Sequence, residues 1–384
     1  MKVRKEIEAI APKMREWQEH LHRHPEIALE EVDSARYIAS ELRAMGYEAE
    51  EGIGTTGLVA TLKVGNGTKN LGIRAEFDAL PIEEVNELPY RSLIEGKSHL
   101  CGHDGHTAML LGAAKYLIDT KNFNGTLTLI FQPAEETMQG SPGMIADGLF
   151  DKYPVDAVYA MHNIPGLEKG KLYFREGATM SAVDNWEIEL VGKGSHGSMP
   201  ELSIDPVVAG ASLVMALQTI ISRNLSPWHN AVVTIGAFIA GNAGNVIANS
   251  AILRLSIRNM IAEDRELVLR RIREITKAQA ECYGCTYEIR EGQPGAVLVN
   301  TPKETAFATQ VAIDTYGAEN VINPAASFMS SEDFAFMLQK KPGTYLMIGN
   351  GDTPMVHHPK YILDQDIFPI GANYWVSLAE AYLK

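Results

Sequence analysis

A thiol, two imidazoles and a carboxylate lie within six consecutive positions, in the segment LCGHDGH at residues 100–106. Thiolate sulfur and imidazole nitrogen are ligands that zinc-like ions prefer in proteins. Cys101 and His103 are therefore candidate metal ligands. The segment also precedes a run with helical spacing, so a polar turn that caps this helix is the alternative interpretation.

A pair of carboxylates and another imidazole follow apolar runs that predict β-strands. Glu135 and Glu136 come shortly after the run at 126–131, and His162 follows the run at 157–161. Strand ends at the carboxyl edge of a parallel sheet are where α/β proteins bind ligands. Because adjacent side chains point in different directions, one glutamate can bind a metal while the other handles protons. The alternatives are a solvated loop for the glutamates and a packing or capping role for the histidine.

Two further motifs could support such a site. The predicted strand at 71–75 delivers Glu76 and Asp78 to one edge of the sheet, where these carboxylates could orient a ligand histidine. Helix capping or a surface ion pair is the alternative for both. His357 and His358 lie in a loop late in the chain, directly before a proline, and are only weakly informative alone.

Three residues between 194 and 258 could contact a substrate. Glycines near His196 suit a loop that approaches a ligand closely. Arg258 is of the residue type that binds a carboxylate through two hydrogen bonds, so Arg258 and Asn245 are candidates for holding a substrate carboxylate. An ordinary turn for His196 and a charge at a strand edge for Arg258 are the alternatives.

The elements that must position these residues alternate between strands and helices. Helical spacing covers 3–23, 30–46 and 106–119, and further helices are predicted at 302–316, 331–339 and 368–383. Strands are predicted at 58–64, 71–75, 126–131, 157–161, 172–174 and 344–348. This alternation predicts an α/β domain with a mostly parallel sheet.

The pattern changes near residue 183. Strands at 186–191, 231–238, 252–258 and 286–290 and helices at 205–222 and 263–283 give a β-α-β-β-α-β order. That order is typical of a ferredoxin-like unit. We therefore expect a catalytic α/β domain at 1–182 and 296–384, with an inserted lid or dimerisation domain at 183–295.

Composition excludes several classes of function. The net charge is −14 and no block of Lys or Arg occurs, which argues against nucleic acid as a partner. No apolar stretch is long and uninterrupted enough to predict a membrane span, and no signal peptide is recognisable, so we expect a cytoplasmic protein. Three cysteines argue against a disulfide framework. The C-x-x-C spacing of Cys282 and Cys285 leaves a thiol oxidoreductase as one rival, although structural cysteines are the better interpretation.

These motifs, in this order, resemble those of a dinuclear metallopeptidase family. The chain is similar to its aminoacylase and hippurate hydrolase branch; the family also contains carboxypeptidase G, succinyl-diaminopimelate desuccinylase and plant auxin-conjugate hydrolases. The resemblance covers essentially the whole chain. It rests on the segments 20–26, 74–81, 101–107, 131–136, 162–163, 192–200, 331–334 and 357–359. Glu76 departs from the pattern, because this branch usually has aspartate there.

The resemblance implies a site with two divalent metal ions per chain, which are zinc or else manganese, cobalt or nickel. The residues that match the family's metal ligands are Cys101, His103, Glu136, His162 and His357. Glu135 matches the general base. His196 matches a lid histidine that reaches an active site in related enzymes, sometimes the active site of the neighbouring subunit. If Cys101 bridges the ions, the remaining ligands divide into two pairs, His103 with His162 and Glu136 with His357.

The resemblance also implies the reaction. We expect an amidohydrolase that cleaves the amide bond of N-acyl-L-amino acids, such as hippurate-like or N-acetyl substrates. We further expect a homodimer or homotetramer that assembles through the lid domain. A dipeptidase or carboxypeptidase on the same fold is the nearest alternative, and a non-catalytic binding protein that retains the fold is a more distant one.

Overall fold

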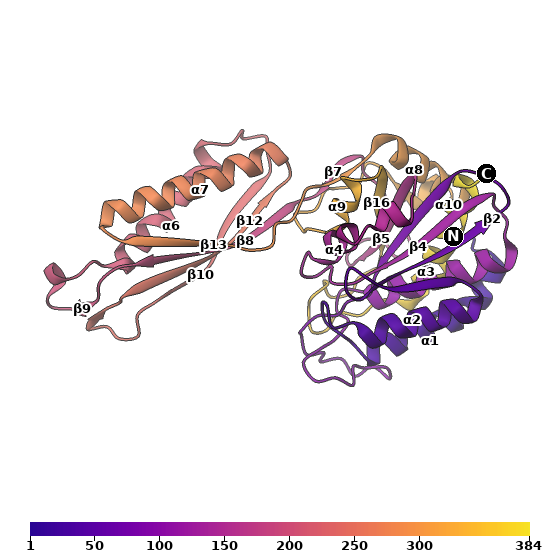
Figure 1. The fold of residues 1–384 in the computed structure, drawn as a ribbon, viewed down its shortest axis with the longest axis horizontal. Helices are drawn as coiled ribbons and strands as arrows, with labels where there is room; N and C mark the ends of the chain where they lie inside the picture. The colour runs from indigo at the N-terminus through magenta and orange to yellow at the C-terminus, as the bar shows by residue number, and fades with distance from the viewer. The chain divides into compact units, whose positions relative to one another are not determined.

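The computed structural model describes residues 1–384 and divides the chain into two compact units (Figure 1). Unit 1 comprises residues 1–177, 299–327 and 333–384, and unit 2 comprises residues 178–298 and 328–332. The predicted insertion at 183–295 falls inside unit 2, which extends further at both ends and also takes in 328–332. Two short strands lie where the chain passes between the units: β7 (Gly177–Met180) and β14 (Leu298–Asn300).

Unit 1 is built on an eight-stranded sheet with the order β1-β2-β4-β3-β5-β16-β6-β15. The strands are β1 (Glu48–Ile53), β2 (Gly57–Val64), β3 (Asn70–Glu76), β4 (Gly125–Gln132), β5 (Ala157–Ile164), β6 (Leu172–Tyr173), β15 (Val321–Ile322) and β16 (Gly343–Gly349). The four central strands, β4, β3, β5 and β16, are parallel to one another, and β1 and β2 add antiparallel neighbours at one side. This sheet confirms the expected α/β class with a large, mostly parallel sheet.

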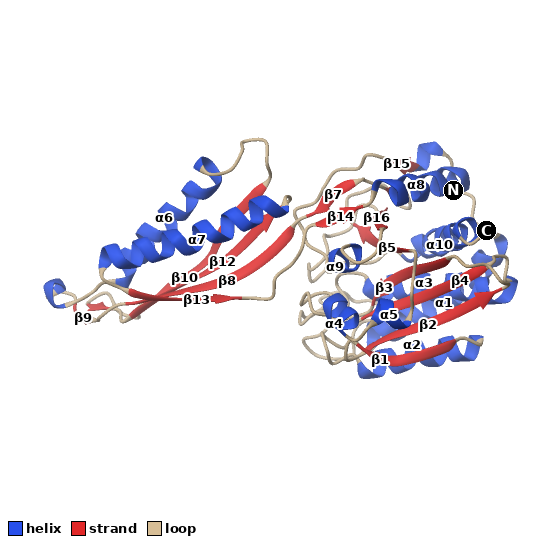
Figure 2. Ribbon diagram, turned by 45° about the horizontal axis from the view of Figure 1, so that its top comes forward, coloured by secondary structure: helices blue, strands red, loops and turns tan.

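Helices cover this sheet (Figure 2). They are α1 (Lys5–Arg23), α2 (Val32–Met45), α3 (His103–Thr120), α4 (Gly140–Ala146), α5 (Leu149–Lys152), α8 (Pro302–Tyr316), α9 (Phe334–Leu338) and α10 (Phe368–Tyr382). Helix α3 packs against α1, α10 and β3, and most of its residues are buried. Because α3 begins at His103, the packing of this helix fixes residues 103–106 of the Cys101–His106 motif.

The register of the parallel strands aligns the candidate site residues. Glu76, the last residue of β3, lies opposite Gln132, the last residue of β4, and Arg74 lies opposite Ala160 of β5. The three strands therefore reach the same edge of the sheet at the same level. Asp78, the paired glutamates and the end of β5 meet there, as expected for ligand sites in open α/β sheets.

Unit 2 has a four-stranded antiparallel sheet with the order β10-β12-β8-β13. Its elements are β8 (Ala182–Val191), α6 (Pro206–Arg223), β10 (Ala231–Ala240), β12 (Ser250–Asn259), α7 (Ala262–Tyr283) and β13 (Thr286–Glu291). The two helices pack together over this sheet around a second apolar core (Figure 1). The β-α-β-β-α-β order is the one expected from the sequence. In the chain, β9 (Ser195–His196) lies between β8 and α6, and β11 (Val246–Ile247) lies between β10 and β12; these two short strands pair into a ribbon.

Helix α6 has a well-defined start and an unusual composition. The Asp205 side chain accepts hydrogen bonds from the backbone N–H groups of Val207 and Val208, and Pro206 occupies the first turn, where no N–H is needed. By length and apolar composition alone, α6 is a helix that could cross a membrane. Leu213, with other apolar residues of the helix, is buried against the sheet of unit 2.

Two parts of the chain illustrate where local patterns and the structure differ. The predicted helix at 331–339 is only α9, Phe334–Leu338, because the Asp333 carboxylate is buried and accepts hydrogen bonds from Gln132 and from the backbone N–H of Ser141. Strand β1 was not predicted, since its sequence EAEEGI is charged and mostly exposed at the sheet edge. Both cases reflect tertiary context that a local pattern does not contain.

Candidate metal centre

A glycine turn separates the first two candidate ligands. Gly102, which lies between Cys101 and His103, has a φ of 101° and directly precedes α3. A Cβ at this position would lie 2.1 Å from Oδ1 of Asn163. Both the left-handed backbone and the close approach require glycine, and together they fix the directions in which Cys101 and His103 project.

Asp78 orients His103 and the turn that bears the paired glutamates. Nδ1 of His103 lies 3.0 Å from both Oδ1 and the backbone oxygen of Asp78, so Nδ1 donates to Asp78 and Nε2 is the ring nitrogen left to face the site. The other carboxylate oxygen of Asp78 accepts a hydrogen bond of 2.9 Å from the backbone N–H of Glu136. This is the arrangement in which a carboxylate fixes the orientation of a metal-ligating histidine.

Glu136 faces two imidazoles and a thiol. Oε1 of Glu136 lies 3.2 Å from Nε2 of His357 and 4.0 Å from Nε2 of His103. The donor atoms of Cys101, Glu136 and His357 all lie within 4.8 Å of one another. The backbone N–H of His357 donates to the carbonyl of Leu100 at 2.7 Å, which ties the late loop to the start of the cysteine motif.

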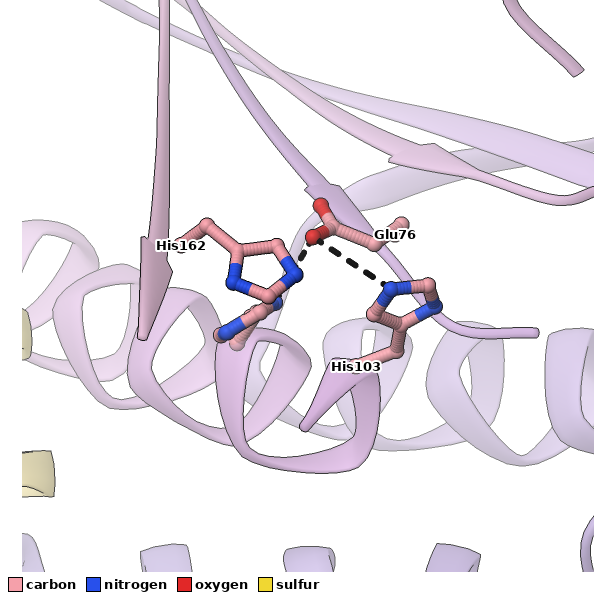
Figure 3. A group of neighbouring side chains, drawn as sticks. Glu76, His103 and His162 are labelled. Carbon is pink, nitrogen blue, oxygen red and sulfur yellow. Dashed lines mark hydrogen bonds and ion pairs between the residues drawn. The ribbon is translucent and has the colours of Figure 1, made fainter. Parts of the chain in front are cut away.

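His162 brings a third imidazole from the end of β5. Its Nδ1 lies 2.6 Å from the backbone oxygen of Asn163, so Nε2 is directed into the site, 3.3 Å from the sulfur of Cys101. Figure 3 shows His162 and His103 on either side of the Glu76 carboxylate, whose Oε1 lies 3.8 Å from Nε2 of His103. The ligand atoms of these residues, together with those of His106, form a second buried group within 4.8 Å.

Glu76 anchors this second group. Its Oε2 accepts a hydrogen bond of 2.5 Å from Arg74, and its Oε1 lies 2.7 Å from Nδ1 of His106. Although burial alone raises the pKa of Glu76, the Arg74 charge and His106 outweigh it and hold this pKa well below its usual range. The other ring nitrogen of His106 contacts Oδ1 of Asn163 at 2.6 Å. Glu76 has a longer side chain than the aspartate that the family resemblance leads us to expect at this position. This side chain contacts both Arg74 and His106.

The donor set fits divalent cations. Nε2 of His103 and Oε1 of Glu136 are buried, and neither makes a hydrogen bond. Burial opposes a charged imidazole, but the surrounding carboxylates, Asp78 first, raise the pKa of His103 to about 10. Burial and the charges of Glu136 and Glu135 raise the pKa of Cys101 well above its usual range. The carboxylates therefore make this space favour positive charge, and a thiolate at Cys101 needs a cation beside it.

Glu135 lies beside the ligand atoms. It is buried, and its carboxylate lies within 4.8 Å of the ligand atoms of His103 and Glu136. The preceding residue, Ala134, has a φ of 51°, a left-handed conformation that bends the chain after β4. This bend places two adjacent carboxylates at the same edge of the sheet.

The predicted residues of unit 2 lie at two places within that unit. His196 and Asn245 are neighbours, because the backbone N–H of Gly197 donates to the carbonyl of Asn245 at 2.8 Å. Arg258 lies near the other end of β12, where its guanidinium donates to the carbonyl of Met329 at 3.0 Å. Eight residues of strand correspond to roughly 27 Å. One copy of unit 2 therefore does not bring Asn245 and Arg258 together on one small carboxylate.

Sequence reasoning missed several residues that hold the site. His106 is the second imidazole of the LCGHDGH segment, and the sequence assigned it no role in the site, yet it joins Glu76 to Asn163. Asn163 also donates to the hydroxyl of Tyr361 at 2.5 Å, a contact between residues 198 positions apart. The only local signal for a role of His106 was its position three residues after the candidate ligand His103. His358 lies outside the cluster, since its Nδ1 accepts the backbone N–H of Lys360.

Comparisons with known proteins find relatives that match nearly the whole chain. Residues 72–381 match the model of Peptidase family M20/M25/M40. A hippurate hydrolase from Campylobacter jejuni is 41% identical over 364 residues, covering 95% of each chain. An N-acetyl-L-cysteine deacetylase from Bacillus subtilis is 34% identical, covering 93% of this chain and 85% of that protein.

Solved structures show the same fold over nearly the whole chain. A crystal structure of a protein from methicillin resistant Staphylococcus aureus has a TM-score of 0.90 at 32% identity and covers 99% of this chain and 98% of that one. A Bacillus subtilis protein described as a dinuclear metal binding peptidase has a TM-score of 0.83 at 30% identity, with coverages of 98% and 99%. On its sequence and its fold, this chain belongs to Peptidase family M20/M25/M40.

Proposed function

We propose that this chain is a metal-dependent amidohydrolase that cleaves the amide bond of N-acyl-L-amino acids. The observation on which the proposal rests is the convergence of thiol, imidazole and carboxylate donors at one sheet edge, with Glu135 beside them. The named activities of the relatives support this reaction class, since the hippurate hydrolase and the N-acetyl-L-cysteine deacetylase both act on N-acyl amino acids.

Two divalent cations would be held by the two groups of donors. Cys101, Glu136 and His357 form one group, and His103 and His162 provide imidazole nitrogens for the other. Mixed sulfur, nitrogen and carboxylate ligands suit zinc best, and manganese, cobalt or nickel can use the same ligands. When bound, such cations polarise a carbonyl and make water acidic enough to supply hydroxide near neutral pH.

Glu135 is the proposed general base. Its carboxylate accepts a proton from the attacking water as the new C–O bond forms at the amide carbonyl. The same carboxyl then donates that proton to the leaving nitrogen as the C–N bond breaks, and a carboxylate and a free amine are released.

His196 is the proposed donor to the developing oxyanion. Its Nδ1 accepts hydrogen bonds from the backbone N–H and the hydroxyl of Ser198, so its exposed Nε2 carries the proton. A positioned donor of this kind contributes about 3–4 kcal/mol to transition-state stabilisation. Because His196 and Asn245 lie far from Arg258 within one unit 2, we propose that the two ends of this unit serve different active sites of an oligomer.

The surface of unit 2 favours a homodimer. Helix α6 exposes Val208 and Met215 at 51% and 70%, although both are large and apolar. Strand β10 forms an edge of its sheet and exposes Phe238 and Ile239. Monomeric proteins rarely leave a large apolar patch or a long apolar strand edge uncovered. A second copy would cover both, and a homotetramer could form from such dimers.

We further propose that the enzyme works in the cytoplasm. All three cysteines are free thiols, which suits a reducing compartment. The acidic net charge of −14 suits neither nucleic acid nor an anionic membrane surface as a partner.

A hydrolysis screen at defined metal loading tests the substrate class. Benzoyl, acetyl and indole-acetyl amino acids would be compared with dipeptides that carry the same C-terminal residue. The proposal predicts kcat/KM at least about tenfold higher for the N-acyl series, because a free amine adds a charge that an acyl pocket does not pair. A preference for dipeptides would instead assign a dipeptidase on the same fold.

A further inference from the structure

A buried carboxylate that the proposed chemistry does not use lies behind the paired glutamates. Glu31 directly precedes α2 and is 0% exposed. Its Oε1 accepts a hydrogen bond of 2.9 Å from the backbone N–H of Ala134, and its Oε2 accepts one of 2.7 Å from the hydroxyl of Thr56. Both contacts join segments that are far apart in the sequence.

The backbone N–H that Glu31 holds belongs to a residue whose conformation directs the paired glutamates. Ala134 is buried, has a left-handed φ of 51°, and directly precedes Glu135 and Glu136. A non-glycine residue in this conformation is held there by its surroundings at a cost of about 1–3 kcal/mol. The carbonyl of Ala134 accepts the backbone N–H groups of Gln139 and Gly140. Hydrogen bonds therefore hold both the N–H and the carbonyl of this residue.

A second carboxylate holds the same turn from the other side. Asp78 accepts the backbone N–H of Glu136, two residues after the N–H that Glu31 accepts. The two glutamates are thus carried by a short segment that is anchored at both ends by buried carboxylates. Movement of either anchor would redirect Glu135 and Glu136 together.

Keeping a carboxylate at position 31 is energetically unfavourable on its own. Burial, together with the charge of Asp78, raises the pKa of Glu31 to about 7 in spite of its hydrogen bonds. A buried acid costs free energy unless its hydrogen bonds compensate. The two hydrogen bonds that Glu31 accepts therefore offset the cost of burying its carboxyl group.

We propose that Glu31 is a positioning residue for the active site, which holds the Ala134 turn so that Glu135 faces the substrate and Glu136 faces the metal. This inference rests on the proposed function, because it assigns Glu31 an effect through the proposed base and the proposed ligand. A purely structural tie between α2 and this turn would lower stability without changing how the glutamates act.

Substitutions at position 31 separate these roles. Glu31→Gln keeps both contacts, since its amide oxygen can accept from Ala134 and its NH2 can donate to the Thr56 oxygen. Glu31→Ala removes both contacts, and Glu31→Asp is one methylene too short to keep them. Thr56→Val is the matched control, because it removes the Thr56 contact and leaves the Ala134 contact intact.

The proposal predicts a split between kcat and KM. At saturating metal, Glu31→Ala and Glu31→Asp should lower kcat about 10–100-fold with KM changed less than about threefold, and Glu31→Gln should restore kcat to within about threefold. Titration with a competing chelator should show one of the two ions bound about tenfold more weakly in Glu31→Ala, because Glu136 is its ligand. Thr56→Val should lower the melting temperature and leave kcat within about threefold.

Three results would overturn the proposal. They are an unchanged kcat in a destabilised but folded Glu31→Ala, a Glu31→Gln variant as impaired as Glu31→Ala, and a rise in KM with unchanged kcat. If Glu31→Ala does not fold, Glu31→Asp and Glu31→Gln still provide the comparison. The chelator titration needs no turnover, so it can support the Glu31 role even if Glu135→Gln shows that the proposed base is wrong.

Discussion

At the scale of single residues, the site depends on which atom of each side chain faces the common space. Asp78 holds Nδ1 of His103, so Nε2 faces the site, where it is buried and makes no hydrogen bond. Asn163 holds Nδ1 of His162 in the same way. Each histidine therefore presents one fixed nitrogen, which is how preorganised metal sites are built.

The roles of the adjacent glutamates can be separated by a single substitution. Glu135→Gln removes the basic carboxylate and keeps the volume, so kcat should fall about 10²–10⁴-fold while both metal ions remain bound. Steady-state kinetics and metal analysis of the same sample provide the check. Substantial residual turnover with both ions present would exclude Glu135 as the base.

Cys101 should be needed for full metal loading. Cys101→Ala removes a buried sulfur that lies among the ligand atoms of both groups, so the variant should bind fewer than two ions per chain. Elemental analysis after gel filtration measures this directly. Cys282→Ala is the matched control, because Cys282 is an exposed free thiol outside the site and its loss should leave the metal content unchanged. Two ions per chain in Cys101→Ala would contradict its role as a ligand.

At the scale of elements, α1 and α3 are joined by a buried charge cluster next to the site. His22 of α1 lies 2.8 Å from Oδ2 of Asp104 on α3 and 3.2 Å from Oε2 of Glu84. Gln18 donates to the same oxygen of Asp104 at 2.5 Å. Because Asp104 follows His103 directly, this cluster helps to fix the first turn of α3.

The cluster makes stability depend on pH. Burial alone lowers the pKa of His22, but hydrogen bonds to Asp104 and Glu84 outweigh it and raise this pKa to about 9. A histidine whose folded pKa lies above its unfolded value stabilises the fold fully below about pH 6.5, and this contribution is lost as pH rises through about 9.

His22→Gln should therefore lower the free energy of unfolding most at pH 6, by up to about 3 kcal/mol, and much less at pH 9.5. Urea unfolding of chelated protein at both pH values measures the difference. His358→Gln serves as the control, since His358 has no carboxylate partner in the structure and its loss should show no such trend. A destabilisation by His22→Gln that stays constant or grows with pH would contradict the charge assignment.

The sequence predicted the candidate ligands at the carboxyl edge of the unit 1 sheet better than it predicted the hydrogen bonds that position them. Cys101 and His103 stand out because they cluster directly before a helix, and His162 stands out because it follows an apolar run that ends at the edge of the sheet. The hydrogen bond between Glu31 and Ala134 spans 103 positions, and no local pattern reports it. The exposed strand β1 was missed for a related reason, because only its pairing with β2 defines it. Local periodicity thus finds elements and their ends, whereas tertiary partners need the fold.

At the scale of the whole molecule, the placement of residues in unit 2 predicts cooperation between subunits. If His196 acts in the active site of the partner subunit, then mixing inactive His196→Ala with inactive Glu135→Gln should restore activity. Random exchange of subunits creates heterodimers with one intact site, so up to about a quarter of the wild-type activity should return. Activity measured after mild dissociation and reassembly gives the test.

A variant that cannot dimerise is the control for this mixture. Met215→Glu places a charge on the exposed apolar face of α6, so it should yield monomers in sedimentation analysis. Adding Met215→Glu to both inactive variants should abolish the recovery. Absence of recovery in dimers that demonstrably exchange subunits would show that His196 acts within its own chain.

The central claim is that two cations bind between residues brought together from distant parts of the chain. Anomalous diffraction from crystals of the metal-loaded enzyme tests this claim most directly. We predict two anomalous peaks per chain, both within coordination distance of the candidate ligands Cys101, His103, Glu136, His162 and His357. A single peak, or peaks bound by other residues while these side chains hold no ion, would contradict the account.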